Sequence, residues 1–279
     1  MIRSIRLLSI LLPALASLVQ AAEVERAAPP CTISDIHNLD VAGCTCQPHH
    51  DGCFTACSTC GWNIKDRNTK SCTPGCTDND WDCKGCGVWF STLCDCLKGG
   101  GSGCTHTGTV KPHGPMIWVL LPKGEHLITT TDLLPGILEM ANDASRYEEG
   151  WDFAQKNHDP SSQALALNSV RSRTHEQFHI HICPKPTSKD PRAYGILSKA
   201  ALNPTNKLKA IAGYNDLFCM SVEKGKGPIK GFATAIHDFL GEKKVCDGLA
   251  GAGIIRDAGD NTWACVTSNK DGPLAYFCA

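Results

Sequence analysis

Several features are scarce in this 279-residue chain, and each scarcity excludes a class of protein. There is no excess of basic residues, because 27 Lys and Arg face 28 Asp and Glu, for a formal charge of −1. A protein that coats nucleic acid needs a clear basic excess, so we expect no nucleic-acid polymer as a partner. Aromatic residues make up only 6% of the chain, yet hydrophobic residues reach 42%. This composition excludes wholesale disorder and allows a sizeable core.

Long apolar runs are also scarce, and the run near the N-terminus is too short to span a bilayer. Residues 1–21 read MIRSIRLLSILLPALASLVQA, with Arg3 and Arg6 ahead of a short apolar stretch. A spanning helix needs roughly 20 apolar residues. The basic start, the short stretch and the small-residue end Val19-Gln20-Ala21 predict a secretory signal peptide. We therefore expect a secreted protein, or one in the lumen of the secretory pathway, without a transmembrane segment.

Cysteine, by contrast, is abundant. Of the 18 cysteines, 13 fall between Cys31 and Cys104 and five follow. Spacings such as Cys57-Ser-Thr-Cys60 would suit zinc in a cytosolic protein. In an oxidising compartment such spacings more often belong to disulfide frameworks, which is the interpretation we favour. Because residues 22–108 contain few aliphatic residues, we expect a small disulfide-stapled domain there, in which cystines replace much of a hydrophobic core.

The two groups of cysteines are both odd in number. Full pairing of 13 early and five late cysteines requires an odd number of bridges between the groups. At least one disulfide should therefore join residues 31–104 to the later part of the chain. The five later cysteines are Cys183, Cys219, Cys246, Cys265 and Cys278.

Residues 109–279 have the pattern of apolar and polar residues that is typical of a globular domain. Apolar residues at helical spacing predict amphipathic helices over 133–147, begun by Thr131 or Asp132, and over 229–240. These helices are too few for a doubly wound parallel sheet, so we expect an α+β fold: an antiparallel sheet with flanking helices. Short apolar runs predict its strands at 116–121, 164–167, 177–182, 251–255, 263–267 and 274–277.

The residues that carry chemistry lie in one segment, 165–183, which reads LALNSVRSRTHEQFHIHIC. Two kinds of residue alternate along its second half: the apolar Phe178, Ile180 and Ile182, and the polar Gln177, His179 and His181. The period of two in a strand sends the apolar set into the core and the polar set onto one face. Two imidazoles then lie about 7 Å apart along a rigid strand.

Hydrogen-bond donors and cations precede these histidines, namely Asn168, Ser169, Arg171 and Arg173. An imidazole beside such groups suits nucleophilic attack on phosphorus, because the donors hold the equatorial oxygens as their charge redistributes. This chemistry demands no metal or other cofactor, since the two arginines supply the countercharge. Two other interpretations stay open. His179 and His181 could bind zinc with His126 or His175, although the neighbourhood is cationic, or the pair could be purely structural.

The same segment resembles the histidine-triad (HIT) superfamily, which carries His-φ-His-φ-His on a strand. The stretch from Asn168-Ser169 to Cys183 is more narrowly similar to the CDP-diacylglycerol pyrophosphatase branch. The similarity covers roughly residues 110–277 and leaves out the Cys-rich segment. It implies a HIT-like antiparallel sheet for residues 109–279.

Roles for individual residues follow from this resemblance. His179 matches the nucleophilic histidine that becomes nucleotidylated, and His181 matches the third histidine, which orients the site and handles the leaving group. Asn168 matches an asparagine that contacts phosphate, and Arg173 an arginine that recurs in the branch. Gln177 stands where the first histidine belongs, which is a departure from the triad.

The function expected is therefore that of a secreted phosphoanhydride hydrolase or nucleotidyl transferase acting through a phosphohistidine. Its substrate would be a small molecule or liponucleotide, of the CDP-diacylglycerol or nucleotide-diphosphate type. We expect His179, His181 and Gln177 to be catalytic, and the substrate to contact Asn168, Ser169, Arg171, Arg173, His126 and His175. One alternative is a non-catalytic secreted binding or effector protein on a HIT scaffold. The other is a HIT pocket recruited to different chemistry on a small secreted metabolite.

Overall fold

The computed structural model describes residues 28–46 except 32, residues 91–99, 105–106 and 117–121, and residues 126–279 with short gaps at 133, 135, 141–143, 170–171, 173–177, 187–191, 243–244, 246 and 270. The expected signal peptide at 1–21 and most of the Cys-rich segment lie outside the described residues. In the part of the chain that is described, no helix has the length and apolar character needed to cross a membrane.

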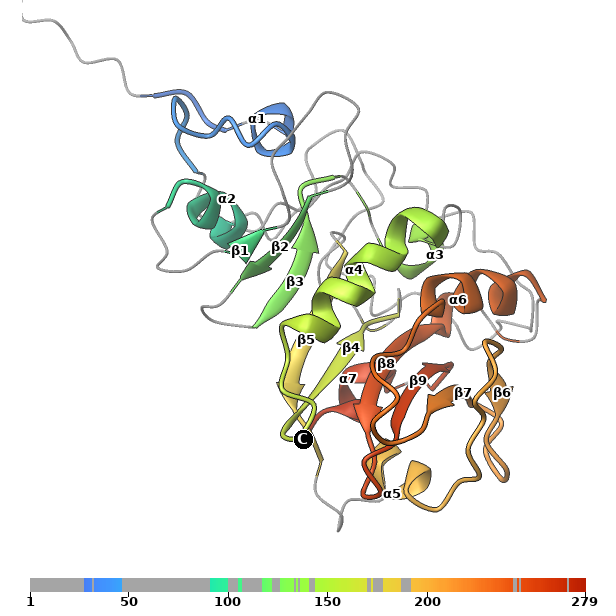
Figure 1. Ribbon diagram of the computed structural model, residues 1–279. Coiled ribbons are helices and arrows are strands. Elements are labelled where there is room, and N and C mark those ends of the chain that lie inside the picture. Colours follow the sequence, from blue (N-terminus) through green and yellow to red (C-terminus); the bar gives the residue numbers. More distant parts are fainter. Residues whose placement is uncertain are drawn as a thin grey trace, which may run out of the picture.

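The described chain has an α+β fold built on one antiparallel sheet, which confirms the expected fold class at this level (Figure 1). Within the described residues the sheet has nine strands, in the order β1-β2-β3-β5-β4-β8-β9-β7-β6. The strands are β1 (Thr105–His106), β2 (Trp118–Leu121), β3 (Leu127–Thr130), β4 (Gln163–Leu167), β5 (His179–Pro184), β6 (Lys209–Ala210), β7 (Leu217–Val222), β8 (Gly251–Arg256) and β9 (Thr262–Thr267). The histidine strand β5 thus lies inside the sheet, with β3 and β4 as its neighbours.

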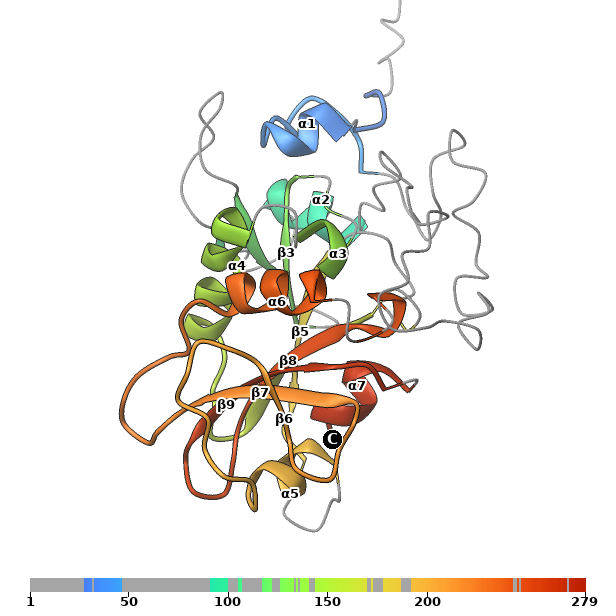
Figure 2. The ribbon, with the colours of Figure 1, turned by 90° about the vertical axis from the view of Figure 1, so that its right-hand side faces the viewer.

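Two helices cover one face of the sheet (Figure 2). They are α4 (Ala144–Lys156) and α6 (Phe232–Gly241), and they pack on each other through the rings of Trp151 and Phe232, 4.8 Å apart. The Glu148 carboxylate of α4 accepts hydrogen bonds from three backbone N–H groups at the start of α6, at 2.6, 3.1 and 2.9 Å. A carboxylate at a helix N-terminus satisfies donors that the helix itself cannot, so this contact locks the two helices together.

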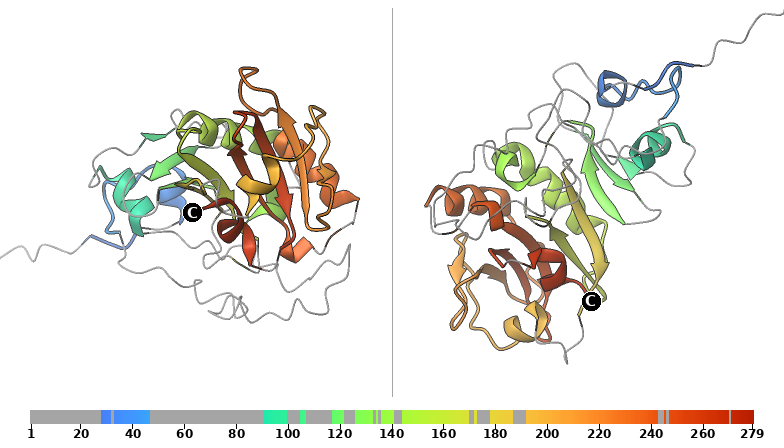
Figure 3. Two further views of the ribbon diagram at one scale, coloured as in Figure 1. Left: turned by 90° about the horizontal axis from the view of Figure 1, so that it is seen from below. Right: turned by 180° about the vertical axis from the view of Figure 1, so that it is seen from behind.

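The opposite face of the sheet is covered in two separate places (Figure 3). Over β2 and β3 lie α1 (Ile33–His37) and α2 (Ser91–Leu97). Ile36 of α1, Leu93 of α2 and Val41 from the segment after α1 are buried there in one apolar cluster with the sheet. Over β4 and β8 lie α7 (Gly272–Phe277) and, beside it, α5 (Ala193–Leu197). Of the other helices in the described chain, α3 (Ile137–Met140) packs into the same core as α4 and α6, and a 3₁₀ turn spans Asp247–Leu249. The described part of the Cys-rich segment therefore packs directly on the sheet.

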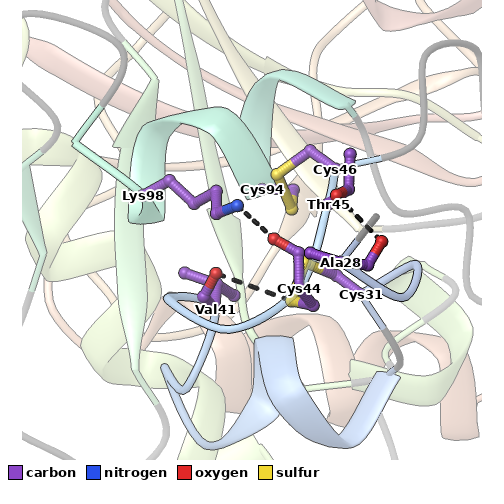
Figure 4. Close-up of a disulfide and its surroundings, with 8 residues drawn as sticks. All are labelled: Ala28, Cys31, Val41, Cys44, Thr45, Cys46, Cys94 and Lys98. Carbon is purple, nitrogen blue, oxygen red and sulfur yellow. Dashed lines mark hydrogen bonds between the residues drawn. A yellow bond between two sulfur atoms is a disulfide. The ribbon is translucent and has the colours of Figure 1, made fainter. Parts of the chain in front are cut away.

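Disulfides occur in both parts of the described chain, as the sequence predicts. Figure 4 shows the two N-terminal bonds, Cys31–Cys44 and Cys46–Cys94. The C-terminal bonds are Cys183–Cys278 and Cys219–Cys265, and Cys96 is disulfide-bonded as well. Sulfur atoms of Cys31, Cys46 and Cys94 lie within 4.8 Å of one another. Because each belongs to a disulfide and not to a thiolate, this cluster does not favour the zinc interpretation.

Two predicted elements differ from the structure. Residues 274–277 belong to helix α7 and not to a strand. The single helix expected over 133–147 is instead the short α3 followed by α4, and neither begins at Thr131 or Asp132. The other predicted strands are present as β2, β4, β5, β8 and β9, and the second predicted helix is α6.

Candidate functional site

Strand alternation on β5 divides its side chains as the sequence predicts. Phe178, Ile180 and Ile182 are buried in the core beneath α4 and α6, at 1%, 0% and 7% exposed. His179 and His181 occupy the other face, where His179 is buried at 3% exposed and His181 is half-buried. The entry into β5 is fixed from the neighbouring strand, because the Thr129 hydroxyl donates to the Phe178 carbonyl at 2.6 Å.

The two imidazoles contact each other edge to face. Their ring centroids are 4.8 Å apart and the ring planes meet at 72°. This separation is shorter than the spacing of about 7 Å between alternate residues of a strand. The side chains therefore lean toward each other and form a single cluster.

Asn168, the residue after β4, contacts the same cluster. Its Nδ2 lies 3.5 Å from Nε2 of His181, a long contact, while its Oδ1 accepts from the Ser172 hydroxyl at 3.2 Å. An amide nitrogen only donates, so Nε2 of His181 is the acceptor and the neutral ring carries its proton on Nδ1. Asn168 is 7% exposed, so the contact is sheltered from water.

A serine turn holds Asn168 in place. The backbone N–H of Ser169 donates to the Ser172 hydroxyl at 3.1 Å, the backbone N–H of Ser172 donates to the Ser169 hydroxyl at 3.2 Å, and the two hydroxyls are 2.9 Å apart. The Ser169 side chain is thus engaged within the turn and is only 1% exposed. Sequence reasoning missed Ser172, although serines three residues apart after a strand are a signal for such a turn.

The start of α7 packs against this turn. Gly272 has a φ of +81°, and a Cβ at this position would lie 2.4 Å from Cβ of Ser172. A Cβ at Gly253 of β8 would likewise lie 2.4 Å from the Phe277 ring. Only glycine allows both approaches, so α7 lies close to the sheet beside the histidine cluster.

Of the remaining predicted site residues, His126 is described, and it does not join this cluster. The backbone N–H of Ile182 donates to the carbonyl of His126 at 2.8 Å, and β3 pairs Leu127 with His181. This register assigns His126 to the face of Ile182, opposite the histidine pair. It therefore does not favour a zinc site made of His126, His179 and His181. Arg171, Arg173, His175 and Gln177 lie outside the described residues.

Several cavities lined by described residues lie away from this cluster. One of about 900 Å³ lies beside α5 and β6 and includes Tyr194 and Tyr214 in its lining. Size alone does not identify the site in this chain, because the paired imidazoles and the amide that orients one of them lie on β5 and β4.

Comparison with known proteins adds little to this geometry. No protein-family model matches the chain, and no curated protein matches its sequence. Among solved structures, the chain is similar to a DUF4931 family protein from Bacillus cereus ATCC 10987, with a TM-score of 0.31 and 12% identity. The alignment covers 57% of this chain and 83% of that chain. A similarity this weak carries no inference about function.

Proposed function

We propose that the protein is a phosphoanhydride hydrolase or nucleotidyl transferase that acts through a phosphohistidine at His179. The observation that carries this proposal is the cluster of His179, His181 and Asn168. It joins two imidazoles with centroids 4.8 Å apart to an amide that contacts the second ring. A positioned imidazole can serve as a nucleophile, and a second one can serve in proton transfer.

In the proposed reaction, a ring nitrogen of His179 attacks a nucleoside-linked phosphorus. The phosphorus–nitrogen bond forms as the anhydride bond to the leaving phosphate breaks. His181, whose orientation Asn168 fixes, donates a hydrogen bond from its Nδ1–H to the oxygen of that leaving phosphate, which departs as an anion. Water then attacks the phosphorus while Nε2 of His181 takes up its proton and passes it to solvent, the phosphorus–nitrogen bond breaks, and free His179 is restored. Arg171 and Arg173 would balance the phosphoryl charge in this scheme, as the sequence predicts.

The surroundings of β5 support this proposal. His181 is paired across the sheet with Leu127 of β3 and with Ala166 of β4. Leu127 belongs to the apolar cluster beneath α1 and α2, and Ala166 to the cluster beneath α5 and α7. The histidines therefore lie on the seam between two covers, on a strand bonded on both sides. A rigid strand limits the motion of the nucleophile, which is the geometric requirement for in-line attack.

A second candidate is a secreted binding protein that uses the same scaffold without catalysis. The burial of His179 favours it, because a ring that is 3% exposed and contacts another ring can also serve a structural role. The two functions differ in one measurable property. Only the hydrolase forms a covalent phosphorus–nitrogen bond.

The experiment is a trapping assay with the purified, oxidised full-length protein. The substrates are CDP-diacylglycerol and a dinucleoside polyphosphate, each radiolabelled in the nucleotide. We expect a quenched adduct that is labile in acid and stable in base, and its loss together with turnover in His179→Ala. His237→Ala, an exposed histidine on α6, is the matched control and should keep full activity. Full activity in His179→Ala would refute the mechanism, and a wild-type protein that binds these nucleotides without turning them over would be the binding protein.

A further inference from the structure

A polar pocket lies on the face of the sheet opposite the histidine cluster. A cavity of about 460 Å³ opens where the end of α4, the loop after β7 and the β8–β9 turn meet. Arg256, the last residue of β8, lines it, and extending the β4–β8 register places Arg256 opposite Gln163. Asn168 of the histidine cluster lies five positions along the chain from Gln163, roughly 17 Å away, on the opposite face. The two sites are therefore separate.

Arg256 lines this pocket and contains a buried donor. Its Nε is buried and makes no hydrogen bond within the described residues. Two carboxylates of the lining are already paired, Asp152 with Lys230 at 2.6 Å and Asp260 with Lys224 at 2.7 Å. Buried donors in folded proteins are nearly always hydrogen-bonded, so a ligand that brings an acceptor would satisfy this guanidinium.

His158 presents an acceptor in the same lining. Its Nδ1 lies 3.0 Å from the Gln155 carbonyl oxygen, which can only accept, so Nδ1 carries the proton. Burial lowers the pKa of His158, and the nearby charge of Arg256 lowers it further. The ring is therefore neutral near pH 7 and its Nε2 carries a lone pair. Oδ1 of Asp152 is a second buried acceptor without a hydrogen-bond partner in the described part of the chain.

The charge of Arg256 lowers the pKa of more than one neighbouring group. The pKa of Lys185 is lowered, first by burial and then by repulsion from Arg256, as that of His158 is. Lys156 adds another cation to the lining, and the exposed Glu223 is the lining carboxylate that opposes an anion. The pocket thus combines a positive centre with a nearby neutral acceptor.

We propose that this pocket binds a small hydroxylated oxyanion, with the oxyanion on the Arg256 guanidinium and a hydroxyl donating to Nε2 of His158. A guanidinium offers several donors in a planar fork, which matches carboxylate and phosphate oxygens. Phosphate monoesters and hydroxy acids share this chemistry. The proposal is independent of the reaction assigned to His179.

The test is calorimetric titration of the oxidised full-length protein at low ionic strength. The probes are inorganic phosphate, glucose 6-phosphate, malate and glucose. We expect one of the hydroxylated anions to bind more tightly than phosphate, and glucose not to bind. Tighter binding of glucose 6-phosphate identifies a phosphate ester as the ligand class, and tighter binding of malate a hydroxy acid.

Substitutions of Arg256 and His158 test whether the anion binds in this pocket. Arg256→Met should weaken it about tenfold to hundredfold, because a hydrogen bond to a charged group is lost. Arg256→Lys keeps the charge without the planar fork, so its affinity should lie between those of the wild type and Arg256→Met. This variant provides the test if Arg256→Met does not fold. The control is Lys226→Gln, which removes one positive charge from an exposed position outside the lining. His158→Ala should weaken binding of the hydroxylated anion and leave inorganic phosphate unaffected.

Two results would overturn the proposal. One is the absence of binding by every charged probe at millimolar concentration. The other is an equal loss of affinity in Arg256→Met and Lys226→Gln, which would mean diffuse attraction and no built site.

Discussion

The two covers on the histidine-bearing face are attached in different ways. The N-terminal cover, residues 28–46 and 91–99, contains two described cystines that both join the cover to itself. Its described contacts with the sheet are largely apolar. The C-terminal cover, α5 and α7, is joined to the sheet by Cys183–Cys278, which links β5 to the residue after α7. The two described cystines of the N-terminal cover are therefore internal, whereas that of the C-terminal cover bonds it to the strand that bears the histidines.

This difference follows from the composition of the two regions. Helices α1 and α2 have five and seven residues, too few to be stable alone in water. The segment around them is poor in aliphatic residues, so cystines must limit the entropy of its unfolded chain. The C-terminal cover instead packs Phe277 tightly over a glycine of β8 and adds one cystine to a conventional core. Predictions that alter one attachment at a time can test this contrast.

The largest expected effect concerns a covalent link between the two regions. Four of the five later cysteines pair with one another, as Cys183–Cys278 and Cys219–Cys265. If all 18 cysteines are paired, Cys246 must therefore bond to a cysteine within 31–104. Cys246 itself lies outside the described residues.

Mass spectrometry of a non-reduced digest tests this prediction. We expect the peptide that contains Cys246 to be disulfide-linked to a peptide from residues 31–104. The Cys183–Cys278 and Cys219–Cys265 peptides are internal controls for native pairing. Alkylation of Cys246 without reductant would contradict full pairing, and the N-terminal cover would then be docked without a disulfide to the rest.

The next effect compares one cystine from each cover. Sequence separations of 48 for Cys46–Cys94 and 95 for Cys183–Cys278 correspond to chain-entropy contributions of about 4 and about 4.7 kcal/mol. Loss of either cystine should therefore cost a similar free energy, but in different parts of the molecule. Replacing Cys46 and Cys94 by alanine should expose amides of the N-terminal cover to exchange while β4, β5 and β8 stay protected. Replacing Cys183 and Cys278 should lower the free energy of unfolding of the whole sheet.

Hydrogen exchange read by peptide, together with denaturant unfolding, distinguishes these outcomes. The double variants serve as controls for each other, because each removes one cystine with a similar chain-entropy contribution. Equal loss of sheet protection in both would mean that the N-terminal cover is an integral layer of the core. The contrast between the covers would then be wrong.

Much of the fold could be predicted because its strands carry local signals. Strands β8 and β9 are short apolar runs between glycine and aspartate turns, and the structure has both. The run 274–277 carries the same signal yet is helical. Gly272, with its positive φ, and Pro273 in the first turn start a helix there. A proline near the start of a segment is typical of a helix N-terminus. The helix expected from residue 133 starts later, because Pro135-Gly136 falls within the pattern, and α3 begins only at Ile137.

Of the candidate site, only the part that lies on β5 could be predicted from the sequence. Alternation alone assigned His179 and His181 to one face, and the structure agrees. The role of Ser172 depends on a turn that folds back on Asn168, and that of Thr129 on a strand from elsewhere in the chain. The face of His126 depends on the register between β3 and β5, which no local pattern encodes.

The smallest of these effects tests how closely the C-terminal cover is tied to the site. Gly272→Ala adds a Cβ that would lie 2.4 Å from Ser172, at a backbone φ of +81°. The backbone strain costs about 1–2 kcal/mol and the overlap about 1–3 kcal/mol. Gly213→Ala is a matched control, because Gly213 has a φ of +84° and nothing within 4 Å of an added Cβ. The difference between the two variants in free energy of unfolding isolates the contact with Ser172.

The same pair of variants also separates stability from site geometry. Displacing Ser172 removes the hydroxyl that donates to Asn168 and holds the amide toward His181. The His181 imidazole resonances should therefore shift in Gly272→Ala and stay unchanged in Gly213→Ala, as followed by NMR of the labelled protein. Identical spectra and equal stabilities in the two variants would show that α7 does not support the site. In that case Cys183–Cys278 would be the link between the C-terminal cover and the histidine strand, and α7 would add nothing to the geometry of the site.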